Sequence, residues 1–214
     1  MRGKKFMRCG GIAAVVVACI AVPGFADPSL QNGDFSAGLS PWAVEYGIVT
    51  DGGGFALFEE DTASLSSTLS QQFTIPALAM QLSFDVLFSS AGTYDDASWP
   101  DALTACLFDN PSDLIPLISN PGYNDFFYMD HTGGVETVGT FDGTHVALDV
   151  SAFRGLDAYL VFDLLASDDG MTTTVSVDNV NVSVVPLPGA LLLGLVGMSA
   201  AAGFCHKFGR RNQA

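Results

Sequence analysis

Apolar and polar residues alternate along several short stretches in the middle of the chain. In "AMQLSFDVLFS", residues 79–89, the apolar positions Met80, Leu82, Phe84, Val86 and Phe88 are separated by single residues, most of them polar. A repeat of two indicates a β-strand with one buried face, because successive side chains of a strand point to opposite sides. The stretch "HVALDVSAF", which starts at residue 145, alternates in the same way. Both stretches predict strands that cover a core with one face.

Other stretches extend this picture to an all-β domain. "AYLVFDLLA", residues 158–166, is apolar on both faces, as expected for a central strand. Turn signals such as "DGGG", "NPSD", "HTGG" and "FDGT" recur at about strand spacing, and no long amphipathic helix is evident between them. The pattern predicts roughly eight to ten antiparallel strands in a single β-sandwich or jelly roll.

The register of the last predicted strand changes within "TVSVDNVNVSVV". Val175 and Val177 lie at odd positions, whereas Val180, Val182 and Val184 lie at even ones. One extra residue at Asp178-Asn179 would restore a continuous apolar face, and a β-bulge supplies one. A bulge also re-aims a side chain, so the Asp178 carboxylate is a candidate metal ligand.

The first 26 residues have the features of a secretory signal peptide. A basic start precedes an apolar stretch at 10–22 and the small-x-small sequence Gly24-Phe25-Ala26, which predicts cleavage after Ala26. An alternative is a lipoprotein signal in which Cys19 is lipidated. The apolar run continues past Cys19, which favours ordinary cleavage.

The last thirty residues combine an apolar run with a basic end. Leu187 to Phe204 carry no charge over 18 residues, and a helix of that length reaches about 27 Å, enough to cross a bilayer core. Cations beyond this run would hold the end on the cytoplasmic side. They are Lys207, Arg210 and Arg211. The sequence therefore predicts one transmembrane helix, with the preceding domain exported.

A proline motif stands directly before this run, in the order Val185, Pro186, Leu187, Pro188, Gly189. Proline motif, apolar run and basic tail together resemble the PEP-CTERM sorting signal of bacteria in its VPLP variant, with Leu187 in place of the name-giving Glu. The resemblance implies processing by an exosortase-type enzyme near the motif. The inner membrane would be an intermediate, followed by the cell surface or the extracellular space, in a bacterium that makes exopolysaccharide. A permanent single-span anchor is the alternative.

The sequence therefore divides into three segments: a signal peptide at 1–26, a β-sandwich domain at 27–185 and a sorting signal at 186–214.

The predicted domain is strongly acidic. All 23 acidic residues and a single Lys or Arg, Arg154, lie between 27 and 185, which gives this segment a formal charge of −22. Such a charge excludes nucleic acid as a partner and attracts divalent cations or basic partners. Solubility, or adaptation to a salty medium, is the alternative explanation of the charge.

Two short motifs resemble those of galactose-binding-like jelly-roll carbohydrate-binding modules. "LQNGDFSAGLSPW", residues 30–42, is similar to their opening, and "SVDNVNV", residues 176–182, to their closing strand. In that family the two ends lie side by side and share a structural calcium ion. The resemblance implies a Ca²⁺ site at Asn32, Asp34 and Asp178. Ser36 replaces the usual Glu and removes one carboxylate from that set.

Aromatic and polar residues gather in two predicted loops, "TYDDASWPD" and "GYNDFFYMDH". Sugar sites place aromatic faces over pyranose rings beside a few polar groups, and sandwiches carry their sites in loops. The ligand-binding candidates are Tyr94, Asp96, Trp99, Asp101, Tyr123, Asn124 and Tyr128. Trp42 is expected in the core instead.

Catalysis has little support in the sequence. The chain contains no Gly-x-Ser-x-Gly and no His-Glu-x-x-His, and His131 and His145 have no metal spacing. Cys106 lies in an alternating apolar run, as a buried strand residue does, and it has no partner for a disulfide within the domain. We therefore expect a non-catalytic β-sandwich that binds glycan or exopolysaccharide. The alternatives are a matrix or coat protein without a specific ligand and, less favoured, a hydrolase.

Overall fold

The computed structural model describes residues 29–61, 63–94, 99–112, 114–167 and 170–184. The predicted signal peptide and sorting segment lie outside these ranges. So do the candidate residues Ala26, Asp96, Val185, Pro186, Leu187, Pro188, Gly189, Lys207, Arg210 and Arg211. Within the ranges given, no helix is both long and apolar enough to span a bilayer.

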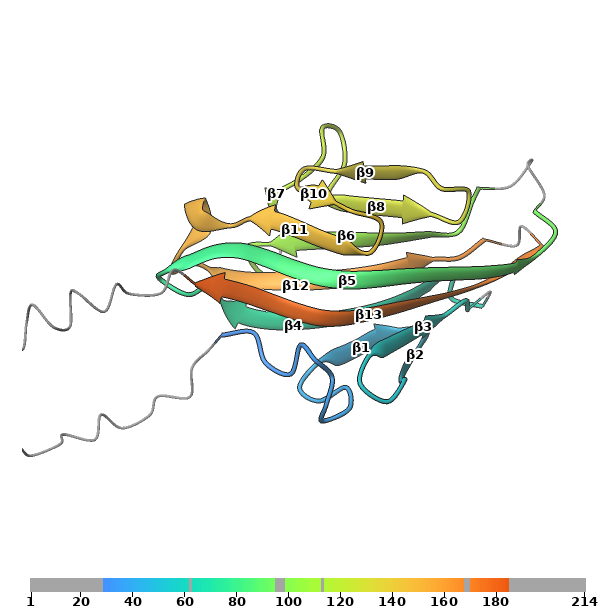
Figure 1. Cartoon of the computed structure of the whole chain (residues 1–214), viewed down its shortest axis with the longest axis horizontal. Coiled ribbons are helices and arrows are strands. Elements are labelled where there is room, and N and C mark those ends of the chain that lie inside the picture. The colour runs from blue at the N-terminus through green and yellow to red at the C-terminus, as the bar shows by residue number, and fades with distance from the viewer. Residues whose placement is uncertain (1–28, 62, 95–98, 113, 168–169, 185–214) are drawn as a thin grey trace, which may run out of the picture.

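Two antiparallel sheets make up the described domain (Figure 1). The first sheet has the order β1 (Ala43–Tyr46), β4 (Ser66–Thr74), β12 (Asp157–Leu165), β6 (Ala102–Phe108), β8 (Phe127–Asp130) and β9 (Val135–Thr137), and β7 (Pro116–Ile118) also pairs with β6. The second has the order β10 (Thr140–Phe141), β11 (His145–Asp149), β5 (Ala79–Gly92), β13 (Met171–Val184), β3 (Ala56–Glu59) and β2 (Ile48–Asp51). One 3₁₀ turn, η1 (Ser151–Phe153), precedes β12.

The strand order is that of a jelly roll. The inner four strands of one sheet are β4, β12, β6 and β8, and those of the other are β3, β13, β5 and β11. Along the chain, all but one of the connections between these eight strands cross from one sheet to the other. This arrangement confirms the predicted all-β sandwich and its jelly-roll form.

The described domain contains more strands than the roughly eight to ten that the sequence predicted. The additional strands, β1, β2, β7, β9 and β10, have two to four residues each and lie outside the inner four of each sheet. Alternation cannot be recognised over so few residues. Four of the five pair with a longer strand, and β2 pairs with β3, which has the same length.

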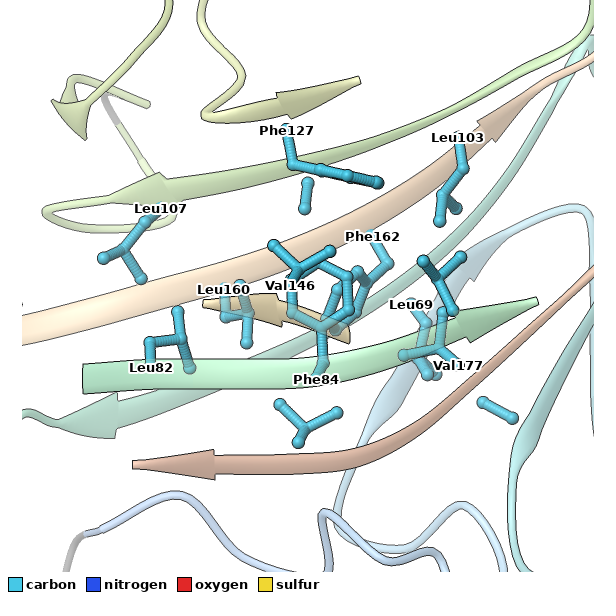
Figure 2. Packing of buried hydrophobic residues seen from close by; sticks show 14 of the residues in the cluster. Leu69, Leu82, Phe84, Leu103, Leu107, Phe127, Val146, Leu160, Phe162 and Val177 are labelled. Atoms are coloured by element: carbon cyan, nitrogen blue, oxygen red, sulfur yellow. The ribbon is translucent and has the colours of Figure 1, made fainter. Parts of the chain in front are cut away.

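Aromatic rings fill the space between the sheets. Phe84 of β5 packs edge-to-face on Phe162 of β12 and on Phe127 of β8, with ring centroids 4.9 and 5.6 Å apart (Figure 2). Trp42 lies between Phe35 and Phe162, and its indole N–H donates to the Asn32 carbonyl over 3.1 Å. Trp42 is therefore a core residue, as predicted.

The predicted register of β13 is confirmed as far as Val182, which is partly buried against the core. Asp178 pairs with Asp85 and Asn181 with Ser83, so β13 has one residue more than β5 over this interval. Asn179 has φ of 52°, the left-handed conformation that a bulge of this kind uses. Val175, Val177 and Val180 are all buried as a result.

Two expected core positions are wrong, since Val184 is 48% exposed and Met80 also faces solvent. Met80 is 43% exposed, whereas Leu82, Phe84 and Val86 of the same strand are buried. The pairing of β13 with β5 shifts again here, from Ser183 with Gln81 to Val184 with Ala79. This second irregularity turns Met80 outward and puts the small Ala79 into the core.

Candidate functional site

A cavity of about 610 Å³ opens where β6 begins and β8 and β12 end, at the right of Figure 1. Pairing places Leu165, Ala102 and Asp130 in one row across three strands, and Tyr128 and Glu136 in the next row on the same face. Side chains in one row point to the same face of a sheet. The small Ala102 between larger neighbours leaves the hollow.

The two loops that the sequence singled out meet at this cavity. Trp99 enters from the loop before β6, and Tyr123 from the loop before β8, while Tyr128 belongs to β8 itself. Trp99 is 85% exposed and Tyr123 60% exposed. Two large aromatic faces are thus held open to solvent beside a hollow.

Hydrogen bonds fix the backbone under both aromatic residues. The Trp99 carbonyl accepts from the Ser167 hydroxyl, which anchors this loop to the segment after β12. In the other loop, Tyr123 N donates to Asn120 O over 3.1 Å, and the Asn120 side chain donates to Asp125 Oδ1 over 2.8 Å. The loops are therefore pre-formed supports for the exposed rings.

Asp101 was a candidate ligand, and the structure places it beneath the loop instead of at the cavity surface. It is fully buried, and its Oδ1 accepts from Ser167 N over 2.7 Å. Its backbone N–H donates to His131 Nδ1, and Tyr94 packs edge-on against the His131 ring at 4.7 Å. Asp101 and Tyr94 thus support the site, while Asn124 is exposed next to Tyr123 but does not line the cavity.

Three carboxylates line the cavity: Asp125, Asp130 and Glu136. Asp130 accepts from the Thr132 hydroxyl and N–H, from Gly134 N and from the Tyr128 hydroxyl. Partial burial by itself would raise the pKa of Asp130, but these hydrogen bonds outweigh it, so the pKa lies below its ordinary value. Asp130 stays charged beside the cavity.

Tyr128 lies close to all three carboxylates. Burial, and then the negative charges of Asp130, Glu136 and Asp125, raise the pKa of its hydroxyl to about 12. The phenol therefore stays protonated and donates to Asp130 Oδ2 over 3.1 Å. None of the three carboxylates was a predicted ligand, although Asp125 and Asp130 belong to the second aromatic loop that the sequence indicated. The "DHTGG" sequence at 130–134, in which Asp130 binds the turn that follows it, indicates Asp130.

The predicted calcium residues lie near one another but not around one point. The N-terminal segment approaches the bulge, as the family resemblance implies: Val180 N donates to Gly33 O over 2.9 Å. Asn32 and Asp34 line a second cavity of about 520 Å³ together with Asn179 and Asn181, and Asp178 does not line it. In the described ranges, no three His, Cys, Asp or Glu side chains form a cluster that could hold a metal.

The Asn32 and Asp178 oxygens also have partners in the chain. Asn32 Oδ1 accepts from Ala37 N over 3.1 Å, while its amide nitrogen donates to two carbonyls. Asp178 Oδ1 accepts from Asn179 N over 2.6 Å. The residues fit a calcium ion in part, and the site stays a prediction.

Beside the bulge, three polar side chains form a hydrogen-bonded group that the sequence did not indicate. His145 Nδ1 lies 2.6 Å from Asp85 Oδ1, and Asn179 Nδ2 donates to Asp85 Oδ2 over 2.8 Å. The hydrogen bond with His145 is the largest cause that holds the pKa of Asp85 below its ordinary value. His145 is a surface strand residue, as expected, but with a defined partner.

Cys106 lies in β6 as predicted and is mostly buried. Burial, followed by the charges of Asp125 and Asp163, raises the pKa of its thiol to about 12. The thiolate needed for nucleophilic attack is therefore scarce at neutral pH.

Comparison with known proteins gives no family. No family of known proteins matches the chain, and no curated protein is significantly similar to it. Among solved structures, TmCBM61 in complex with β-1,4-galactotriose is similar, with a TM-score of 0.41 and 14% identity over 73% of this chain and 97% of that one. The enzymatically active domain of tailspike protein 4 from bacteriophage CBA120 has a TM-score of 0.39 and 12% identity, over 73% and 21% of the two chains. A carbohydrate-binding module specific for non-crystalline cellulose, CBM28, has a TM-score of 0.37 and 13% identity, over 72% and 94%.

Proposed function

We propose that this chain is a non-catalytic glycan-binding protein and that the cavity beside Trp99 is its binding site. The observation that carries the proposal is the pair of open rings, Trp99 at 85% and Tyr123 at 60% exposure, at the rim of a cavity of about 610 Å³. An exposed tryptophan next to a hollow is costly to keep in water unless a ligand covers it.

The chemistry of the lining suits a sugar. The apolar face of a pyranose ring packs on an aromatic face, and the equatorial hydroxyls need acceptors around them. Carboxylate oxygens of Asp125, Asp130 and Glu136 supply such acceptors. Leu165 and Val135 add apolar surface at the edge of the cavity.

Binding of oligosaccharides by Trp99→Ala and Tyr123→Ala variants tests the proposal. A glycan array with the unmodified protein identifies ligands, and calorimetry then gives their affinities. We expect each substitution to weaken binding at least about tenfold, which corresponds to the loss of one stacked ring. Tyr46→Ala is a matched control, because Tyr46 is 67% exposed on β1 of the same sheet but far from the cavity in strand order. An array without any ligand would contradict the proposal.

The terminal segments support an exported protein that an exosortase-type system delivers to the cell surface or extracellular matrix. In the described domain, Val184 ends β13 at the opposite end of the sandwich from the cavity (Figure 1). β13 has 14 residues, so the two ends lie on the order of 45 Å apart. A domain held by its C-terminal side would thus present the cavity outward.

Processing tests the delivery route. In a host that carries an exosortase, replacing both Pro186 and Pro188 by Ala should leave the full-length chain in the inner membrane. The unmodified chain should appear at the surface in a shorter form. Equal processing of the two would contradict the route, and a surface form of full length would indicate a permanent anchor.

One observation favours the alternative of a matrix protein. The outermost strand β1 exposes all four of its residues, including Val44 at 44% and Tyr46 at 67%. An open strand edge with apolar side chains can pair with another chain. Concentration-dependent assembly in sedimentation velocity that Tyr46→Lys abolishes would favour this alternative.

A further inference from the structure

The charge around the cavity indicates which class of glycan it accepts. The lining contains Asp125, Asp130 and Glu136 but neither Lys nor Arg. Arg154 is the one Lys or Arg among residues 29–184 of the sequence. Its guanidinium lies at the other end of the sandwich, where it donates to Ala79 O and Met80 Sδ. No cation of the described domain compensates the cavity.

The partners of these carboxylates are neutral. Asp130 is held by hydroxyl and backbone N–H groups, and Asp125 by the Asn120 carboxamide. Glu136 is exposed on the edge strand β9, directly across from Tyr128. Hydrogen bonds from neutral donors stabilise a carboxylate without removing its charge. Three negative charges therefore act on whatever occupies the space beside Tyr128.

The surroundings of Tyr128 and the open rings agree with this charge. The negative charges of all three carboxylates add to burial in keeping the Tyr128 phenol protonated. The faces of Trp99 and Tyr123 also attract cations, since an aromatic face carries negative charge density. Both parts of the site thus favour a ligand that combines an apolar ring face with a positive group.

We propose that the cavity selects glycans with protonated primary amines, that is, de-N-acetylated hexosamine units, over neutral glycans, and that it rejects uronates and sulfated sugars. This inference rests on the proposed glycan-binding function. A protonated amine near Tyr128 would meet carboxylates in a site that is partly screened from solvent, whereas a uronate would be repelled by the same groups.

Calorimetry with three sets of oligosaccharides tests the selection on the full-length protein. The ligands are β-1,4-linked oligomers of glucosamine and of N-acetylglucosamine and an α-1,4-linked oligomer of galacturonate, all of the same length. We expect the glucosamine oligomer to bind at least about tenfold more tightly than its N-acetylated counterpart and the galacturonate oligomer not to bind. This preference should shrink as salt rises from about 0.05 to 0.5 M, because salt screens charges.

The Glu136→Gln variant tests the contribution of one carboxylate charge at the cavity. It should reduce the preference for the amine about two- to fivefold, because Gln keeps an acceptor oxygen but carries no charge. Glu59→Gln is the matched control, since it makes the same change of net charge on β3 of the other sheet. An equal loss in both variants would show that overall charge attracts the ligand, which would overturn the inference.

Two further outcomes separate this inference from the proposed function. Equal affinity for the amine and N-acetyl oligomers, with both lost in Trp99→Ala, would overturn the selection and leave the glycan site intact. Binding of glucosamine oligomers that Trp99→Ala does not weaken would mean non-specific attraction of a polycation, and would contradict both.

Discussion

The two tryptophans of this chain have opposite environments. Trp42 is 6% exposed, packed between Phe35 and Phe162, whereas Trp99 is 85% exposed at the rim of the cavity. Burial of a large ring contributes to stability, and exposure of one makes it available to a ligand. The same residue type thus has a structural role in one place and a binding role in the other.

We predict that alanine substitutions separate these two roles. Trp42→Ala should lower the free energy of unfolding by about 3–5 kcal/mol, because it leaves a large void between the sheets. Trp99→Ala should change it by less than about 0.5 kcal/mol while it weakens glycan binding. Urea unfolding followed by circular dichroism measures both. A destabilised Trp99→Ala variant would show that this ring is part of the packing.

A second residue-scale prediction concerns Asp85 and pH. Its pKa lies below the ordinary 3.8, mainly through the hydrogen bond with His145, so the folded state favours the charged form. A depressed pKa stabilises the fold fully above the unfolded value of 3.8, and this contribution disappears as the pH falls through the folded value. Asp85→Asn should therefore be less stable than the unmodified protein at pH 7, and the difference should shrink below pH 3.8.

Urea unfolding at a series of pH values between 7 and the acid limit of the fold measures this difference. Asp178→Asn is a suitable comparison, because Asp178 pairs with Asp85 across β13 and β5 and binds only the neighbouring Asn179 N–H in the described contacts. A gap between Asp85→Asn and the unmodified protein that does not change with pH would count against the role of the charged form.

At the scale of elements, the long strands could be predicted and the short ones could not. β5 and β13 have fourteen residues each, long enough for a repeat of two to stand out, and the slip at Asp178-Asn179 was visible in the valines themselves. β12 has nine residues and was recognised as a run that is apolar on both faces. The irregularity at Met80 left no such sign, because one Met in an alternating run fits either face. Short strands such as β9 and β10 form where a longer neighbour offers hydrogen bonds, which is not a property of their own residues.

The close contact between the N-terminal segment and the bulge gives a prediction at this scale. A Cβ on Gly33 would lie 1.7 Å from the Val180 carbonyl oxygen, so the two backbones must separate if Gly33 is replaced. Gly33→Ala should cost about 1–3 kcal/mol of stability, since extra atoms in a tight contact displace the backbone. Ser36→Ala is the control in the same segment, because its side chain is exposed and donates only to Asp34 in the described contacts. Equal stability of both variants by urea unfolding would contradict this contact.

At the scale of the whole molecule, the site depends on strand order more than on any motif. Composition indicated two aromatic loops, and the sheet brings them together because β6 and β8 are neighbours. The Leu165 side of the cavity comes from β12, which lies far from the first loop in sequence, and the Glu136 side comes from β9, the strand that follows β8. The burial of Asp101 could not be predicted either, since the surroundings of a loop carboxylate depend on chain segments that the local sequence does not contain.

Overall charge leads to a prediction about ions. A formal charge of −22 between residues 27 and 185 makes the folded domain repel itself, so the melting temperature should rise with sodium chloride. We expect calcium to raise it further than sodium chloride at equal ionic strength, because an ion that binds only the folded state stabilises it. Asp34→Asn should remove this extra rise. Identical curves for calcium and sodium would eliminate the predicted site.

Strand order also dictates a sequence of events during biosynthesis. The final strand, β13, lies at the centre of the second sheet, between β5 and β3. Until Thr174–Val177 of β13 have emerged from the ribosome or the export channel, no strand pairing joins the β2–β3 pair to β5 and β11. The domain therefore cannot close progressively from its N-terminus. The nascent domain would remain unfolded, and able to pass through a narrow pore, until most of β13 had been made. Both sheets would then be completed in one late step.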